Sequence, residues 1–241
     1  MQQRFFQRLS GGVQQLVQEL ENFAGVEIDV RPAPVPSGET AANPKAVILA
    51  ASEEGAALLY RNEDAFGPRL VLHELLHLQR YWIDCVPQLM PVSDPDGDKT
   101  RIANEIENTL EHLVIVPREA AYGFDPYSFY RESATKSWET YPWPDIKESW
   151  ARRKTCFLNW LTATLLVKED EITSLAERSL NQEGLYEEAK RFSDKIGEVV
   201  NSKERCISTV VRFLRIPRNE AALGYLDIRN KSFVKRPIPE H

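Results

Sequence analysis

The chain has 241 residues, 42% of them hydrophobic, which is enough for a substantial core built as one large domain or as one domain with a helical extension. Its formal net charge of −6 and its lack of a basic run argue against nucleic acid as a partner, because phosphate binding depends on clustered Lys and Arg. No stretch is long and apolar enough to span a membrane, and the N-terminus lacks the apolar core of a secretory signal, so we expect no membrane partner.

The first 60 residues predict a helix followed by three strands. Apolar residues recur at helical spacing from Gln3 to Phe23, and residues 26–30 alternate apolar and acidic side chains. Short apolar runs at 45–50 and 56–60, with turn-forming residues between them, predict two further strands. The proline-rich segment 31–44 is typical of a surface loop or a stiff spacer.

His73, Glu74 and His77 form an HExxH motif inside a leucine-rich segment that we predict as a helix, with Asp64 and Pro68 as start signals. Residues four apart share one helix face, about 5–6 Å apart at Cβ, where one divalent ion can contact both imidazoles. In zinc hydrolases with this spacing, the intervening glutamate takes a proton from the attacking water. The alternative is a buried amphipathic helix with two histidines in ordinary core contacts.

A catalytic zinc site needs a third protein ligand and one open position. Residues 101–117 predict a second helix, ended by Pro117, whose apolar stripe has Glu107 on its flank and Glu111 one turn further along. We predict Glu107 as the third ligand and Glu111 as the acceptor that orients a liganding histidine through its distal N–H. The reverse assignment stays open. So does His112, on the opposite flank, as third ligand or as hydrogen-bond donor to a charged intermediate.

The HELLH motif at 73–77, followed by ENTLEHLVIVP at 107–117, resembles the zincin-type metallopeptidases whose third ligand is glutamate, the gluzincins in the broad sense. It is loosely similar to the small bacterial metallopeptidases of ImmA/IrrE type. The resemblance covers roughly residues 45–117. It implies a small mixed sheet packed on the HExxH helix, zinc (Zn2+) as the metal, and a peptide bond as the substrate.

The order of helix, three strands and HExxH helix predicts an α+β fold, with a small mixed sheet packed on the HExxH helix and a Glu-bearing helix. A strand edge beside the metal would let an extended peptide add as another strand. We expect residues 1–121 to form the metallopeptidase core and residues 122–241 to be an aromatic loop and a mostly helical part packed on it.

We assign no site residue to three later segments. Residues 94–98 predict a turn between the two site helices. Residues 122–144 are rich in aromatics and turn formers, and we expect either a cleft wall or an irregular loop packed on the core. From residue 145 the pattern is helical again, with a last helix at about 203–214 and a strand at 225–228.

Cys85, Cys156 and Cys206 are an odd, widely spaced set without a CxxC pair, so neither a disulfide framework nor a zinc knuckle is predicted. Such usage is typical of a reducing cytoplasm, which we expect to be bacterial.

The sequence therefore predicts a zinc-dependent hydrolase, and specifically a peptidase with Glu74 as general base and a peptide or protein as substrate. Two alternatives stay open. One is a metal-binding sensor or interaction protein with a non-catalytic site, and the other is a hydrolase of a small amide or ester. The sequence does not specify an oligomeric state.

Overall fold

The computed structural model describes residues 1–34, 47–94, 97–144 and 146–240. Over these residues the fold is α+β, with helices in the majority and two small sheets of three strands each. The predicted fold class and the helical C-terminal half are confirmed. None of the helices in these ranges combines the length and the apolar character that crossing a membrane requires.

The chain divides into two compact units whose segments alternate along the sequence. Unit 1 comprises Met1–Pro87, Arg118–Phe124 and Gly224–Lys235, and unit 2 comprises Gln88–Pro117, Asp125–Leu223 and Arg236–His241. The functional division that we predicted after residue 121 stays a prediction, because compactness alone does not test it.

Unit 1 contains the three strands that the sequence predicts near the N-terminus. Its elements are α1 (Gln3–Phe6), α2 (Gly11–Ala24), β1 (Asp29–Pro32), β2 (Val47–Ser52), β3 (Gly55–Tyr60), η1 (Glu63–Ala65) and α3 (Pro68–Trp82). The strand order is β1-β3-β2, with β1 parallel and β2 antiparallel to β3, so the sheet is mixed as expected. Residues 35–46, which include most of the predicted proline-rich connection, lie outside the described ranges.

The single N-terminal helix that we predicted is wrong, because the chain leaves the helix after Phe6 and starts a new one at Gly11. Ser10 adopts an extended conformation at the junction, and two glycines follow it. Glycine is among the poorest helix formers, so a helix boundary here costs little. The second helix keeps the predicted apolar face, and Val13, Leu16, Val17 and Leu20 are all buried.

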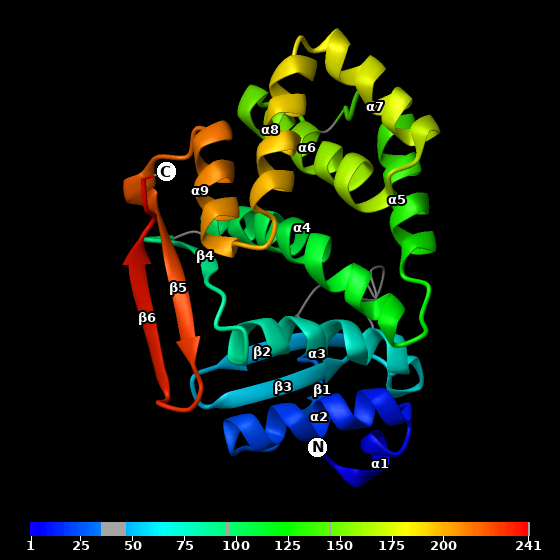
Figure 1. Ribbon diagram of the computed structural model, residues 1–241, viewed down its shortest axis with the longest axis vertical. Coiled ribbons are helices and arrows are strands. Elements are labelled where there is room, and N and C mark those ends of the chain that lie inside the picture. Colours follow the sequence, from blue (N-terminus) through cyan, green and yellow to red (C-terminus); the bar gives the residue numbers. More distant parts are fainter. Residues whose placement is uncertain (35–46, 95–96, 145, 241) are drawn as a thin grey trace. The chain divides into compact units, whose positions relative to one another are not determined.

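Helix α3 carries the HExxH motif and packs along strands β2 and β3 (Figure 1). It begins at Pro68, which favours a first helical position because its missing N–H has no partner there anyway. Six apolar side chains of α3 are at most 1% exposed: Val71, Leu72, Leu75, Leu76, Leu78 and Trp82. Each such burial stabilises the fold by about 1.5–3 kcal/mol, so together they fix the rotation of α3 about its axis.

Helix α4 (Asp98–Ala121) continues past the residue where we expected it to end. Pro117 lies inside the helix, where it removes one backbone hydrogen bond. The turn after Pro117 makes its own contacts in unit 1. Arg118 donates from Nη1 to Asp84 Oδ2 over 3.2 Å, and Glu119 is fully buried. These contacts explain why the helix continues for one more turn.

Unit 2 is largely helical, as the sequence predicts. Its helices are α5 (Tyr127–Glu139), α6 (Ser149–Leu161), the π-helical η2 (Thr162–Val167), α7 (Asp170–Gln182), α8 (Tyr186–Val199), α9 (Lys203–Phe213) and the short η3 (Arg218–Glu220). The irregular aromatic segment that we expected at 122–144 is wrong in its central part, because 127–139 form α5. Tyr130, Ala134 and Trp138 recur at intervals of four and are buried, so the aromatic residues follow a helical period.

The second sheet has the strand order β4-β5-β6, from β4 (Gln88–Pro91), β5 (Ala221–Asp227) and β6 (Ser232–Pro237). The orange and red arrows of Figure 1 are β5 and β6. The strand predicted at 225–228 is confirmed over 225–227, the last part of β5, whereas β4 and β6 were not predicted. Residues 95–96 of the predicted turn lie outside the described ranges.

A buried ion cluster joins α4 to α9 inside unit 2. Lys203 Nζ lies 2.9 Å from Glu107 Oε2 and 2.7 Å from Glu111 Oε1, and all three residues are at most 7% exposed. Burial raises the pKa of the Glu107 carboxyl, which the charge of Lys203 opposes. Burial alone would lower the pKa of Lys203, but the two carboxylates outweigh it and the pKa is raised. Lys203 therefore stays charged beside two acidic groups.

We expect Lys203→Met to destabilise unit 2 by about 3–5 kcal/mol at pH 7, because it leaves two carboxylates buried without their cation. Burial raises the folded pKa of Glu107, and without the cation that opposes this shift the pKa lies above the unfolded value of about 4.3, so the penalty is present at neutral pH and fades as pH falls toward that value. Urea unfolding of the variant and the wild type at pH 7 and pH 4.5 measures this difference.

The matched control is Lys195→Met, because Lys195 lies on the surface of α8 and is paired with Glu198. Its effect should stay within about 0.5 kcal/mol at both pH values. A Lys203→Met penalty of the same size at both pH values would contradict the ionic origin of the stabilisation.

Candidate metal centre

The two histidines of the HExxH motif lie side by side on α3, as their spacing predicts. Their ring centroids are 5.0 Å apart with an interplanar angle of 79°. Their candidate ligand atoms lie within 4.8 Å of each other. Two nitrogens bound to one tetrahedral zinc ion at about 2.0–2.1 Å each lie about 3.4 Å apart, so small side-chain rotations would allow both to bind one ion.

The orientation of α3 determines where these imidazoles point. At about 100° per residue, His73 and His77 project from the side of α3 opposite Val71 and Leu75, the centre of the buried apolar stripe. His77 is 7% exposed and its ring stacks on Tyr81, with centroids 6.3 Å apart. His73 is more accessible, with 19% of its side chain exposed. The pair is thus mostly shielded, with one member open to solvent.

Glu119 favours one tautomer of the neutral His73 imidazole. Its carboxylate Oε1 lies 2.8 Å from His73 Nδ1, and its Oε2 lies 3.3 Å from Arg69 Nε. An ionised carboxylate can only accept hydrogen bonds, so Nδ1 carries the proton and donates it. The lone pair of neutral His73 is then on Nε2, which is the arrangement of a histidine prepared to bind a metal. Glu119 is fully buried, and Arg69 supplies the balancing charge.

Glu74 lies at the edge of the sheet. Its Oε2 accepts a hydrogen bond from the backbone N–H of Leu49 in β2 over 3.2 Å. This bond ties a residue of α3 to the strand and restricts the rotamer of the carboxylate. Glu74 is therefore held at the edge of β2 by this contact.

The other two predicted metal residues have a different environment. Glu107 and Glu111 lie in unit 2, where both bind Lys203, and Glu107 Oε1 also accepts from Leu89 N over 2.7 Å. The role that we predicted for Glu111, as acceptor for a liganding histidine, is filled for His73 by Glu119. His112 lies on α4 with its ring against Tyr130, with centroids 5.3 Å apart.

Glu119 and Arg69 were not predicted as site residues. We predicted that the second helix ends at Pro117, and Glu119 lies beyond that residue. The available signal was the run Glu119, Ala120 and Ala121, all good helix formers directly after the proline. Arg69 had no signal of its own, because an arginine in the first turn of a helix is ordinary.

The donor set of unit 1 fits a borderline metal such as zinc. It offers two imidazoles four residues apart, one of them with its proton held on the distal nitrogen by a carboxylate. The comparisons add no relative: no family model, curated protein or solved structure matches the chain. Any functional assignment therefore depends on the geometry of these residues.

We expect the neutral form of His73 to carry its proton on Nδ1 in the metal-free protein. A long-range 1H–15N NMR spectrum distinguishes the two tautomers. In Glu119→Ala the acceptor is gone, so His73 should shift to a mixture rich in the Nε2–H form that predominates in free imidazole side chains. His77 serves as the internal control and should change little. A wild-type His73 with its proton on Nε2 would contradict the assigned role of Glu119.

Proposed function

We propose that the chain is a zinc-dependent hydrolase, and that its substrate is a peptide bond. The observation that carries the proposal is the contact between His73 Nδ1 and the buried Glu119 carboxylate, which leaves Nε2 as the ligand atom of an HExxH pair. A histidine in an ordinary core contact has no need of a buried carboxylate and an arginine behind it. The i, i+4 spacing supplies the second imidazole from His77.

Each residue of the proposed site has a separate role. His73 and His77 would hold the ion, and Glu119 of α4 keeps His73 in the required tautomer. Zinc bound there would lower the pKa of a water molecule toward neutrality and polarise a substrate carbonyl. The Glu74 carboxylate receives the proton of the attacking water and passes it to the leaving amine. The hydrogen bond from Leu49 N holds Glu74 in place for both transfers.

The edge of β2 supports a peptide as the substrate. Within the described ranges, no strand pairs with the edge of β2 that faces away from β3. Leu49 N donates to Glu74, so Leu49 directs its backbone polar groups to that edge, and so do Val47 and Ala51 at alternate positions. An extended peptide hydrogen-bonded there would run past Glu74. A small amide or ester lacks the extended backbone that would pair with such an edge.

We expect Glu74→Gln to retain about one zinc ion per chain and to lose peptide hydrolysis by about 100-fold or more, because the amide cannot accept the proton. Elemental analysis and digestion of a peptide library measure the two quantities. Glu54→Gln is the matched control, because Glu54 lies exposed in the β2–β3 turn and should keep full activity. Unchanged turnover in Glu74→Gln would remove Glu74 from the mechanism.

A third protein ligand is still required, and the sequence offers Glu107, Glu111 and His112 on α4. Recruiting either carboxylate would take it from the buried ammonium of Lys203, which is unfavourable. We therefore expect His73→Ala and His77→Ala to lose zinc. Glu107→Gln and Glu111→Gln should keep zinc and lose stability instead. Zinc titration of the folded variants decides, and zinc loss confined to a glutamate variant would restore the original assignment.

The same experiments separate the alternatives. Zinc retained without cleavage of any peptide or small ester would indicate a non-catalytic site, as in a metal-binding sensor. Cleavage of esters alone would indicate a small-molecule hydrolase. We also propose a reducing cytoplasm as the compartment, which is supported by the lack of any disulfide among Cys85, Cys156 and Cys206.

A further inference from the structure

Unit 2 contains a cavity of about 230 Å3 that the proposed hydrolase function does not use. Its walls come from β4, the first turns of α4, Trp150 of α6 and the segment that follows α9. Most of the lining is apolar, including Leu89, Ile102, Ile106 and Ile216. Pockets for drug-sized molecules occupy about 300–1,000 Å3, so this cavity fits a smaller organic molecule.

The cavity walls are held by polar contacts on several sides. Glu107 accepts from Leu89 N and binds Lys203, which ties β4 and α9 to α4. Trp150 Nε1 donates to Leu214 O over 2.8 Å, which fixes the indole at the end of α9. The space is therefore bordered by fixed elements.

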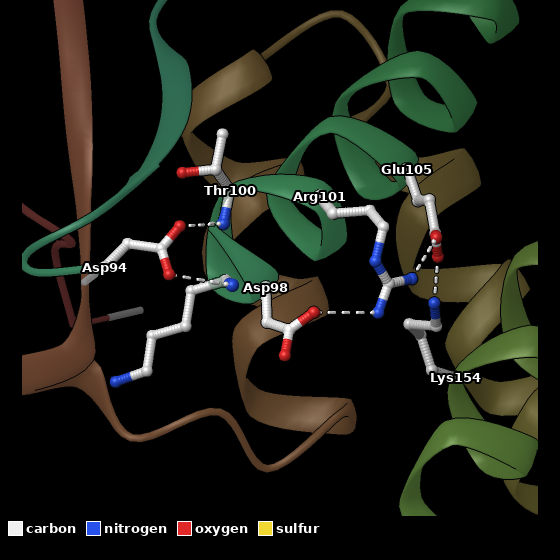
Figure 2. A network of polar contacts seen from close by, with 7 residues as sticks. Asp94, Asp98, Thr100, Arg101, Glu105 and Lys154 are labelled. Atoms are coloured by element: carbon white, nitrogen blue, oxygen red, sulfur yellow. Dashed lines mark hydrogen bonds and ion pairs between the residues drawn. The ribbon is translucent and has the colours of Figure 1, made fainter. Parts of the chain in front are cut away.

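Figure 2 shows the contacts that hold the start of α4. Asp94 accepts from the backbone N–H groups of Lys99 and Thr100, and hydrogen bonds from Thr100 hold its pKa below the usual value. Further along α4, Glu105 binds the buried Lys154 of α6, one turn from Trp150. These bonds keep two of the lining helices together.

Three charged residues also line the cavity, and they differ in how they are engaged. Lys99 and Glu220 form an ion pair of 2.8 Å, so their charges offset each other. Arg215 has no side-chain hydrogen bond or ion pair among the described residues. One acidic group that its charge affects is Glu188, which already binds Arg153. The distance from Arg153 Nη1 to Glu188 Oε2 is 2.8 Å. The lining thus has an excess of one positive charge.

The backbone at Arg215 supports a role for its side chain. Its φ is +58°, at the position where the helix ends and the N–H of Ile216 bonds to Val211 O. Glycine is the usual residue at such a helix end, because any side chain is strained in the left-handed conformation. The chain thus has a strained arginine beside an apolar cavity where a glycine would be more stable.

We propose that this cavity binds a small organic carboxylate, with its apolar body among the isoleucines and Trp150 and its carboxylate on Arg215. A guanidinium binds a carboxylate through two parallel hydrogen bonds, and an apolar body fits a lining with few other polar groups. The proposal is independent of the metal centre, whose two histidines lie in unit 1.

The test compares three ligands that share a chain and differ in the head group. Octanoate should bind the purified full-length protein with 1:1 stoichiometry and a dissociation constant of about 1 mM or tighter, which is within reach of about ten non-hydrogen atoms. Octanol and octylammonium should bind about tenfold more weakly, because neither accepts a charge-assisted hydrogen-bond pair. Isothermal titration calorimetry measures all three, with 4-phenylbutanoate as a second carboxylate.

The decisive variants are Arg215→Gly and Lys168→Gly. Both replace a basic residue with positive φ at a helix end, and Lys168 does not line the cavity. Each should raise the melting temperature by about 1–3 °C through relief of strain. Only Arg215→Gly should weaken octanoate to the level of octanol. Ala103→Leu, which fills the cavity without changing charge, should weaken all three ligands.

Two results would overturn the proposal. One is the absence of saturable binding by both carboxylates. The other is equal loss of octanoate binding in Lys168→Gly and Arg215→Gly, because binding would then depend on net charge and not on the cavity. Loss of zinc in unit 1 variants has no bearing on either result.

Discussion

The rotation of α3 about its own axis is the constraint on which the proposed site depends. Val71 and four leucines on one side of that helix are at most 1% exposed, and turning the helix by one residue would expose several of them. The histidines do not set this rotation. They lie on the side of the helix opposite the apolar stripe. Core packing therefore determines the direction in which the two imidazoles point.

Helix α4 illustrates how one element serves two environments. In unit 2 its glutamates neutralise a lysine whose ammonium would otherwise be buried alone. In unit 1 its last turn supplies the carboxylate that orients His73. Both roles use acidic residues of the same helix, and only their partners distinguish them. An acidic residue on the flank of an apolar stripe is thus ambiguous until the residue facing it is known.

That ambiguity marks the limit of what the sequence could predict. The HExxH pair is local, because four residues of helix determine the separation of its imidazoles. The three strands before it follow from one alternating segment and two short apolar runs. The partner of Glu111 is Lys203, 92 residues away, and no periodicity identifies it. Glu119 was lost for a different reason. A proline usually ends a helix, but here the contacts of the following turn outweigh the missing hydrogen bond.

The burial of the groups around His73 explains why the hydrogen bond between Glu119 and His73 strongly favours one tautomer of the imidazole. Glu119 is wholly buried, Arg69 is partly exposed, and the imidazole has 19% of its surface open to solvent. A buried carboxylate without a partner is costly, so Glu119 strongly favours having both of its donors in place. The proton on Nδ1 is therefore held by a group in the interior of the protein, and the lone pair of the neutral ring lies on the opposite nitrogen. A histidine that only filled space would show no such division between its two nitrogens.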